Sequence, residues 1–102
     1  MASRLKLHEE LCDLLQSRNV YFSPPASVLM KYDAIRYSLS DPNIDRANDK
    51  VYIKVNKYEG IVITHDPDSM VPDAILRHFE MCSLGKPYVA DNLNHFPFTL
   101  YY

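Results

Sequence analysis

The sequence is poor in glycine, with only Gly60 and Gly85 in 102 residues. A loop that cradles phosphate groups needs several glycines within one short turn, so nucleotide binding through such a loop is excluded. The GxSxG and HExxH motifs are also absent, and no pair of carboxylates stands on a recognisable scaffold. Nothing in the pattern argues for an enzyme, and we expect no cofactor.

Cysteine is scarce and tryptophan is missing. Two cysteines are too few for a disulfide scaffold, and both Cys12 and Cys82 lie among apolar residues in segments that read as helices. We expect them to be reduced core residues. Eight tyrosines and four phenylalanines supply the aromatic content. Tyrosine suits surfaces that are partly dry and partly wet, which favours an interaction protein.

The sequence also lacks an excess of basic charge and a long apolar run. Eleven Lys and Arg against 13 Asp and Glu give a net charge of −2, so counterion release provides no drive toward a nucleic-acid backbone. No run approaches the ~20 apolar residues of a membrane span, and the first apolar segment carries acidic residues, unlike a secretory signal. We therefore expect a soluble intracellular protein with no membrane contact.

Length and composition predict a single domain over residues 1–102. The chain is 47% hydrophobic, and its length is close to the common domain size. A domain this small buries only about 60–70% of the surface that its unfolded chain exposes. Association with other copies or partners would therefore stabilise it.

The first third of the chain predicts a helix and then a short strand. Leu7, Leu11, Leu14 and Leu15 recur at helical spacing, with Ser3 as a candidate N-cap and Asn19 as a candidate left-handed stop. The β-prone run VYF follows and is closed by two prolines, which do not donate to a ladder. That strand must be brief or lie at a sheet edge.

The middle of the chain predicts a hairpin. Residues 32–40 alternate between apolar and polar, as in a half-buried strand, and residues 41–50 read as a long charged loop. Residues 51–64 predict one long bent strand, or two strands with a break near Asn56. Gly60 marks a bulge or a close approach of another chain segment.

The last third predicts a second helix and a final strand. Val71, Ile75, Phe79 and Cys82 recur at helical spacing after an N-cap at Asp68 or Ser69. Residues 88–94 read as a loop and residues 95–102 as a strand that pairs with the strand beginning near Val51 or Tyr58. The apolar residues that alternate along this final strand are Phe96, Phe98, Leu100 and Tyr102.

Together these elements predict an α+β fold, with two helices packed on a mainly antiparallel sheet in the order helix, strands, helix, strand.

One repeated spacing raises the possibility of a metal site. His8 and Cys12 are four residues apart in the first predicted helix, as are His78 and Cys82 in the second. This spacing places both side chains on one helix face, and two Cys with two His form a competent zinc set. No CxxC is present, however, and both cysteines fit the apolar stripes without a metal, so we favour core positions.

Two possible catalytic groups have simpler explanations. His65, Asp66 and Asp68 offer an imidazole and two carboxylates for acid–base work or metal binding, but a strand end followed by an N-cap accounts for all three. Cys82 as a nucleophile would need a base or a helix N-terminus to lower its pKa. An enzyme acting through Cys82 or His65 is therefore the less favoured hypothesis.

Interaction surface remains as the most promising function class. The charges of residues 41–50 alternate in sign, as in a surface that recognises a copy of itself, although a solvated hairpin also explains them. Asn92 and Asn94 lie in a segment that either caps the core or meets a neighbour, and Tyr101 and Tyr102 are candidate interface anchors. The charged candidates are Asp41, Asp45, Arg46, Asp49 and Lys50.

Several stretches resemble a known protein group. SRLKLHEELCDLLQSRNVYFSPP, MKYDAIRYSLSD, THDPDS and YVADNLNHFPFTLYY together are similar to small tailed-phage proteins encoded among head–tail joining genes, and this group resembles the tail-terminator, or tail-completion, proteins of long-tailed phages. The resemblance covers nearly the whole chain and implies an α+β fold of the same element order.

The resemblance also implies a structural function. Such proteins form a six-membered ring that caps the tail tube and provides the surface to which the filled head is joined, with strand edges and long loops closing the ring. The implied partners are further copies of the chain, the tail tube protein and the head–tail connector or stopper, while DNA passes through without specific binding. The implied location is the virion neck, after assembly in the host cytoplasm. Alternatives are a connector stopper and a small zinc-stabilised adaptor domain.

Overall fold

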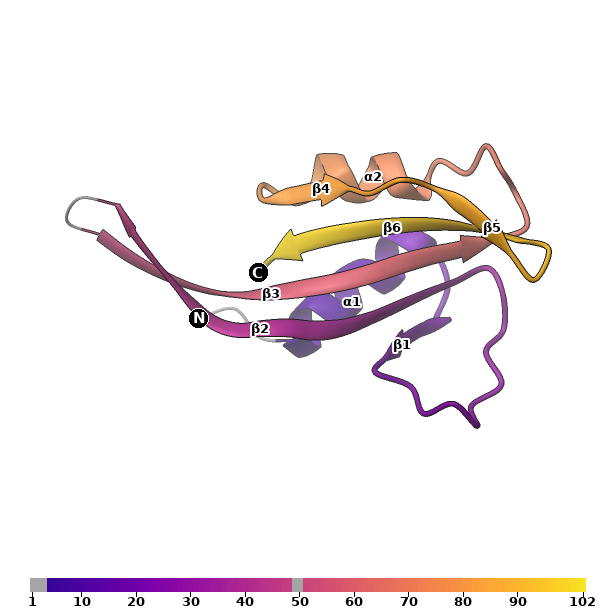
Figure 1. The fold of residues 1–102 in the computed structure, drawn as a ribbon, viewed down its shortest axis with the longest axis horizontal. Coiled ribbons are helices and arrows are strands. Elements are labelled where there is room, and N and C mark those ends of the chain that lie inside the picture. Colours follow the sequence, from indigo (N-terminus) through magenta and orange to yellow (C-terminus); the bar gives the residue numbers. More distant parts are fainter. Residues whose placement is uncertain (1–3, 49–50) are drawn as a thin grey trace.

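The computed structural model describes the backbone of residues 4–48 and 51–102, and the side chains of residues 4–40 and 56–102. It confirms the α+β class, with two helices and a six-stranded sheet (Figure 1). The elements in chain order are α1 (Arg4–Leu15), β1 (Val20–Phe22), β2 (Ala34–Asn48), β3 (Val51–Thr64), α2 (Val71–His78), β4 (Cys82–Leu84), β5 (Tyr88–Ala90) and β6 (Leu93–Tyr101).

The sheet is mainly antiparallel, as predicted. Its strand order is β1, β2, β3, β6, β4, and β5 pairs with β6 alongside β4. Of the strands described, the three-residue β1 alone runs parallel to its neighbour, where Val20 pairs with Ile35 and Phe22 with Tyr37. The final strand therefore lies inside the sheet rather than at its edge.

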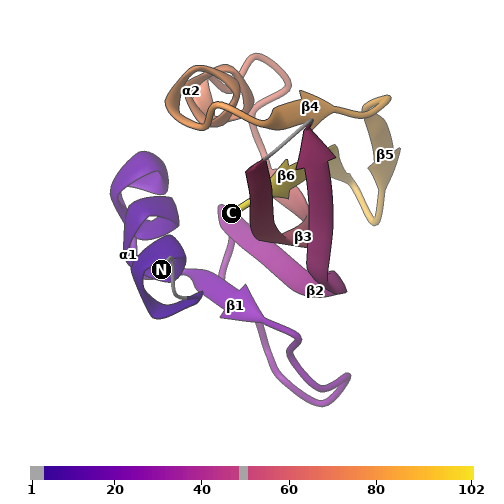
Figure 2. The ribbon, with the colours of Figure 1, turned by 90° about the vertical axis from the view of Figure 1, so that its left-hand side faces the viewer.

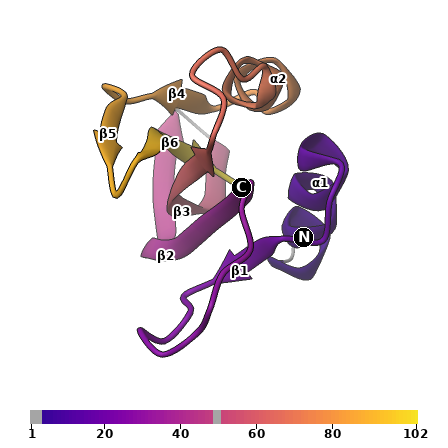
Figure 3. The ribbon, with the colours of Figure 1, turned by 90° about the vertical axis from the view of Figure 1, so that its right-hand side faces the viewer.

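Both helices pack on one face of the sheet and leave the other face bare (Figures 2 and 3). We call the bare side the open face. The core lies between the helices and the covered face and is built from α1, α2 and the strands β1, β2, β3 and β6. Its buried residues are Leu7, Leu11, Cys12, Leu15, Val20, Ile35, Tyr37, Tyr58, Val62, Ile75, Phe79, Phe98 and Leu100.

Helix α1 ends earlier than its sequence pattern predicts. Its buried leucines at 7, 11 and 15 follow the predicted stripe, but Gln16, with φ 59°, takes the left-handed conformation that we assigned to Asn19. The side chain of Asn19 instead donates to the carbonyl of Asp33, 3.3 Å away, and so ties the end of this segment to the start of β2. The predicted N-cap Ser3 lies outside the described residues.

Helix α2 is also shorter than predicted, because Cys82 belongs to β4. Phe79 is already extended, with ψ 135°, and Cys82 pairs with Leu100 of β6. Phe79 and Cys82 match the helical spacing although they lie beyond the helix, because the segment after α2 also directs apolar side chains to the core. Met70, not Asp68 or Ser69, is the N-cap residue, although the Ser69 hydroxyl accepts a hydrogen bond from the Val71 N–H at 3.2 Å.

Strand β6 confirms the predicted alternation but starts earlier, at Leu93. Phe98 and Leu100 are buried in the core, and Phe96 and Tyr102 pack against it. The strand pairs with residues 57–64 of β3. Segment 88–94 is not a loop throughout, because β5 occupies Tyr88–Ala90 and the turn to β6 consists of Asp91 and Asn92 at positive φ.

Pro97 is accommodated inside the sheet by a break in the neighbouring strand. Its carbonyl accepts a hydrogen bond from the Gly85 N–H at 2.9 Å, and in an antiparallel strand the N–H and C=O of one residue point to the same side. The missing N–H of Pro97 therefore faces the gap between β4 and β5. No bond of the β3–β6 ladder is lost.

The segment predicted as a charged loop, residues 41–50, is mostly strand. Strand β2 continues to Asn48 and β3 begins at Val51, with register irregularities between Leu39 and Asp41 and between Asp41 and Ile44. β3 is one strand through Asn56, which decides between the two predicted alternatives. We call residues 41–48 and 51–55 the arm, because they project from the body along the 48 Å long axis (Figure 1).

Candidate interaction surface

The four candidate zinc ligands do not form a site. The Nδ1 atom of His8 lies 2.8 Å from the Tyr37 hydroxyl, Cys12 is buried in the core and Cys82 lies on β4. Burial raises the pKa of both thiols. Within the described parts of the chain, no three His, Cys, Asp or Glu side chains are grouped as metal ligands. The zinc-stabilised adaptor hypothesis therefore lacks its ligand set.

The segment that contains His65 follows a strand end, as the simpler interpretation predicted, but turns rather than an N-cap account for Asp66 and Asp68. The Asp66 N–H donates to the Thr64 hydroxyl at 3.0 Å, and the Asp68 N–H donates to the carboxylate of Asp66 at 2.8 Å. The His65 N–H donates to Asp33 at 3.0 Å. These bonds hold the connection between β3 and α2.

A cluster of polar side chains joins both helices to the last residue of the chain. One carboxylate oxygen of Glu10 lies 2.7 Å from Nε2 of His78, and the other accepts a hydrogen bond from the Tyr102 hydroxyl. Burial, followed by the bond to Glu10, raises the pKa of Tyr102 to about 12. Burial disfavours the ionised form of Glu10, but the bonds from Tyr102 and His78 outweigh it and lower the pKa of Glu10. We call these three residues the clasp.

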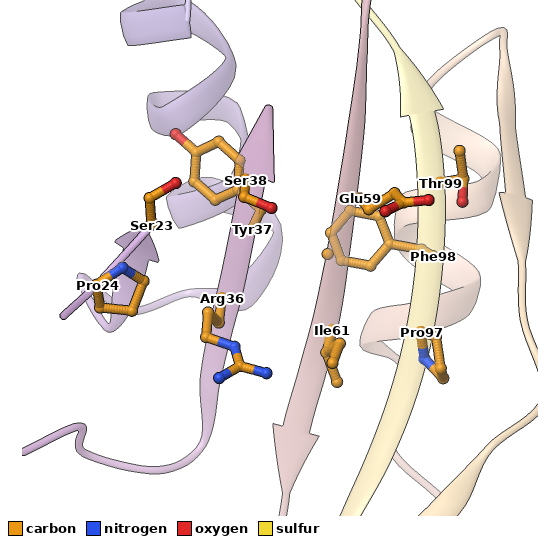
Figure 4. Close-up of a pocket in the computed structure, with 11 residues that line it drawn as sticks. Ser23, Pro24, Arg36, Tyr37, Ser38, Glu59, Ile61, Pro97, Phe98 and Thr99 are labelled. Atoms are coloured by element: carbon orange, nitrogen blue, oxygen red, sulfur yellow. The ribbon is translucent and has the colours of Figure 1, made fainter. Parts of the chain in front are cut away.

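The open face carries a groove of about 490 Å³ that crosses β2, β3 and β6 (Figure 4). Its side chains form two neighbouring cross-strand rows, and Ser23 and Pro24 at the end of β1 form one rim. The rows are Arg36, Ile61 and Pro97, followed by Ser38, Glu59 and Thr99.

The groove combines two apolar side chains with exposed charges of both signs. Ile61 and Pro97 are partly exposed in one row, next to the exposed Arg36, and Glu59 is exposed in the middle of the neighbouring row. Glu59 lies 4.0 Å from the Lys57 ammonium, at the outer limit of an ion pair. Apolar side chains next to charged groups on an exposed sheet face are compatible with a surface that binds another protein. Reasoning from the sequence missed this groove, because its residues come together only through the strand register.

An exposed apolar loop stands next to this surface. Residues 23–33 connect β1 to β2 and carry Leu29, which is 94% exposed, together with Val28 and Tyr32. The Lys31 N–H donates to the Tyr21 hydroxyl and the Val28 N–H to the Pro25 carbonyl, both at 3.0 Å. The loop therefore presents its leucine from an ordered base. The sequence held no periodic signal that would have found it.

The contact residues predicted from the sequence fall into two groups, one in the segment 41–50 and one near the ends of β6. The backbone of Asp41, Asp45 and Arg46 lies in the arm, whereas Asp49 and Lys50 lie outside the described residues.

The remaining four candidates lie near the two ends of β6. Asn92 is exposed in the turn before β6. Asn94 donates to the carbonyls of Thr64 and His65, at 3.3 and 3.4 Å, and so ties β6 to the end of β3. The backbone N–H of Tyr101 donates to the Met81 carbonyl at 2.9 Å, and Tyr102 belongs to the clasp.

Comparison with known proteins gives no further guidance. No protein-family model matches the sequence, and no curated protein matches it. Within the described residues, neither helix is long and apolar enough to cross a membrane.

Proposed function

We propose that this chain is a structural protein of the neck of a long-tailed bacteriophage, a tail terminator that forms a six-membered ring over the end of the tail tube. The ring joins the tube to the connector or stopper at the head. The resemblance of the sequence to tail-completion proteins supports the proposal. The structural observation that carries it is the arm, residues 41–48 and 51–55.

The arm is a two-stranded ribbon that leaves the body of the sheet. Among the described residues, β1 pairs with β2 at residues 35–37, and β6 pairs with β3 at residues 57–64. Beyond those positions the described parts of β2 and β3 pair with each other, from Ile44 and Val55 to Asn48 and Val51. An isolated two-stranded ribbon is marginally stable in water and presents main-chain groups at both edges. Contact with a neighbouring subunit or with a neck protein would complete these edges.

The charge of the chain agrees with a ring through which DNA moves. A net charge of −2 gives no counterion-release drive toward the phosphate backbone, so DNA would pass without being held. The partners in this proposal are other copies of the chain, the tail tube protein and the connector or stopper. Its place is the virion neck, after assembly in the host cytoplasm, and its role is structural rather than catalytic.

Deletion of the arm tests this function. A variant in which residues 43–54 are replaced by Asn-Gly keeps every described core residue, and we expect it to fold. It should fail to complement a phage that lacks the gene, so that filled heads and separate tails accumulate. Lys86→Ser, an exposed change in the connection between β4 and β5, is the control and should give normal virions.

Electron microscopy of the separated particles distinguishes the two neck roles. A tail terminator should be found on tails that lack heads, whereas a connector stopper should be found on heads that lack tails. Normal virions from the gene deletion, or a protein absent from the neck, would contradict both roles.

A further inference from the structure

We propose that the loop of residues 23–33 inserts Leu29 into the open-face groove of a second copy of this chain. The inference rests on the proposed ring and names one of the contacts that would close it. Its basis is that the same molecule carries both an exposed apolar side chain and a groove with apolar lining residues that could receive it in another copy.

The loop is built to present Leu29 rather than to cover it. Leu29 is 94% exposed, more than any other large apolar side chain in the described part of the protein. The hydrogen bonds of Lys31 to Tyr21 and of Val28 to Pro25 fix the loop on both sides of the leucine. A loop that is ordered before binding loses little conformational freedom when it docks.

The groove has the shape and polarity to receive an aliphatic side chain. Its volume of about 490 Å³ exceeds that of one leucine side chain, and Ile61 and Pro97 provide an apolar floor. The polar side chains around the floor, including Ser38 and Thr99, would form the rim of the contact.

Charge complementarity favours a second copy as the occupant. Lys31 follows Leu29 by two residues and is exposed. The groove carries the exposed carboxylate of Glu59 in one row and the exposed guanidinium of Arg36 in the other row, beside Ile61. Lys57 approaches that carboxylate only to 4.0 Å, so a closer cation can be accommodated. A leucine in the groove would bring the lysine of the same loop toward Glu59.

The loop does not fill the groove of its own chain. Ser23 and Pro24 lie at the groove rim, and from there the loop leads away from the sheet before it returns to β2 (Figures 1 and 2). Because loop and groove are different patches, a copy that fills its neighbour's groove keeps its own groove for a third copy. Contacts of this kind form closed rings when the rotation between subunits permits.

Charge reversal and its rescue test the contact in the purified full-length protein. Lys31→Glu and Glu59→Lys should each weaken self-association about tenfold or more, because each places like charges together. The double variant should restore most of the association. Sedimentation velocity and native mass spectrometry over a concentration series provide the measurement, and circular dichroism checks that each variant is folded.

The leucine itself is tested against a matched residue. Leu29→Asp should weaken association about thirtyfold or more if it is a central anchor, whereas Leu5→Asp, at a site on α1 that is 68% exposed, should have little effect. Rings that survive Leu29→Asp, or a wild-type protein that stays monomeric at all concentrations, would overturn the inference.

The outcomes separate this contact from the proposed function. If Leu29→Asp leaves the rings intact but blocks head–tail joining, the loop binds another neck protein and the proposed contact is wrong. If rings depend on Leu29 and Lys31 but the gene deletion yields normal virions, the contact stands and the neck function falls.

Discussion

Gly60 lies opposite Phe98 in the β3–β6 ladder, and the Phe98 ring occupies the space of a side chain at residue 60. A Cβ atom there would lie 2.7 Å from Cε2 and 2.9 Å from Cε1 of that ring. Because φ at Gly60 is not positive, the glycine is required for space rather than for backbone conformation. The close approach predicted from the sequence is therefore confirmed.

We expect Gly60→Ala to lower the free energy of unfolding by about 1–3 kcal/mol, since the Phe98 ring must move within a packed core. In an unobstructed strand the same change would be neutral or mildly stabilising, so the sign of the effect is diagnostic. Urea denaturation measures it.

The matched control is Gly85→Ala, where the added Cβ would be 3.2 Å from the Pro97 Cβ at an exposed site. It should change stability by less than Gly60→Ala does. Equal stability of Gly60→Ala and the wild type would show that the ring moves freely.

The groove could not be predicted from the sequence, because its residues are brought together by the register of three strands. Alternation placed Arg36 on the outer side of its strand, but nothing local indicated that Ile61 and Pro97 would stand beside it. That row depends on the register of three strands, and register is set by long-range pairing. Leu29 was missed for a different reason, because a single apolar residue in a proline-rich loop produces no periodicity.

At the scale of elements, the clasp joins α1, α2 and the end of β6. The pKa of Tyr102 is raised, so its neutral form is favoured in the folded state. Its contribution to stability is complete below pH 10.0, the ordinary value, and is lost as the pH rises toward about 12. The pKa of Glu10 is lowered, so its contribution is present above pH 4.5 and is lost as the pH falls through the folded-state value.

We therefore expect Tyr102→Phe to lower the free energy of unfolding by about 1 kcal/mol in the neutral range, as for a partly exposed hydrogen bond to a charged group. The difference from the wild type should shrink at acid pH, where Glu10 is protonated, and at alkaline pH, where Tyr102 ionises. Denaturation at a series of pH values measures this profile.

Tyr88→Phe is the control, because the ring of Tyr88 makes its contact by stacking on His95 at 4.8 Å. A profile for Tyr102→Phe that is flat across the whole pH range would contradict the clasp.

The elements were predictable where one pattern applied along their whole length. The leucines of α1 and the alternation from Phe96 to Tyr102 identified their elements because each has one buried face. α2 was predicted too long because Phe79 and Cys82 matched helical spacing while the backbone had already become extended. Residues 41–50 were predicted as a loop because they are charged and turn-forming, but such residues are also compatible with a solvated ribbon of two strands.

At the scale of the whole molecule, the two helices form one layer that covers one face of the sheet. Because no helix covers the open face or the arm, these are the main surfaces at which other proteins could bind. Their residues come from strands that also form the core, so contact at these surfaces would stabilise the folded state directly.

We expect the thermal midpoint of the protein to rise with protein concentration, because association stabilises only the folded form. Leu29→Asp should show a smaller rise, since it removes one proposed contact. Differential scanning calorimetry over about a hundredfold range of concentration, where tight association contributes a few kcal/mol, measures both. A midpoint independent of concentration in the wild type would mean that isolated copies do not associate.

The continuity of the arm with β2 and β3 has a mechanical consequence. A pull on the arm would act parallel to the strands and load the β3–β6 ladder, from residue 57 to residue 64, in shear. Its hydrogen bonds run perpendicular to the strands, so they would resist the pull together instead of opening one after another. In the proposed neck ring, tension between a head and its tail would therefore be borne by the whole ladder at once.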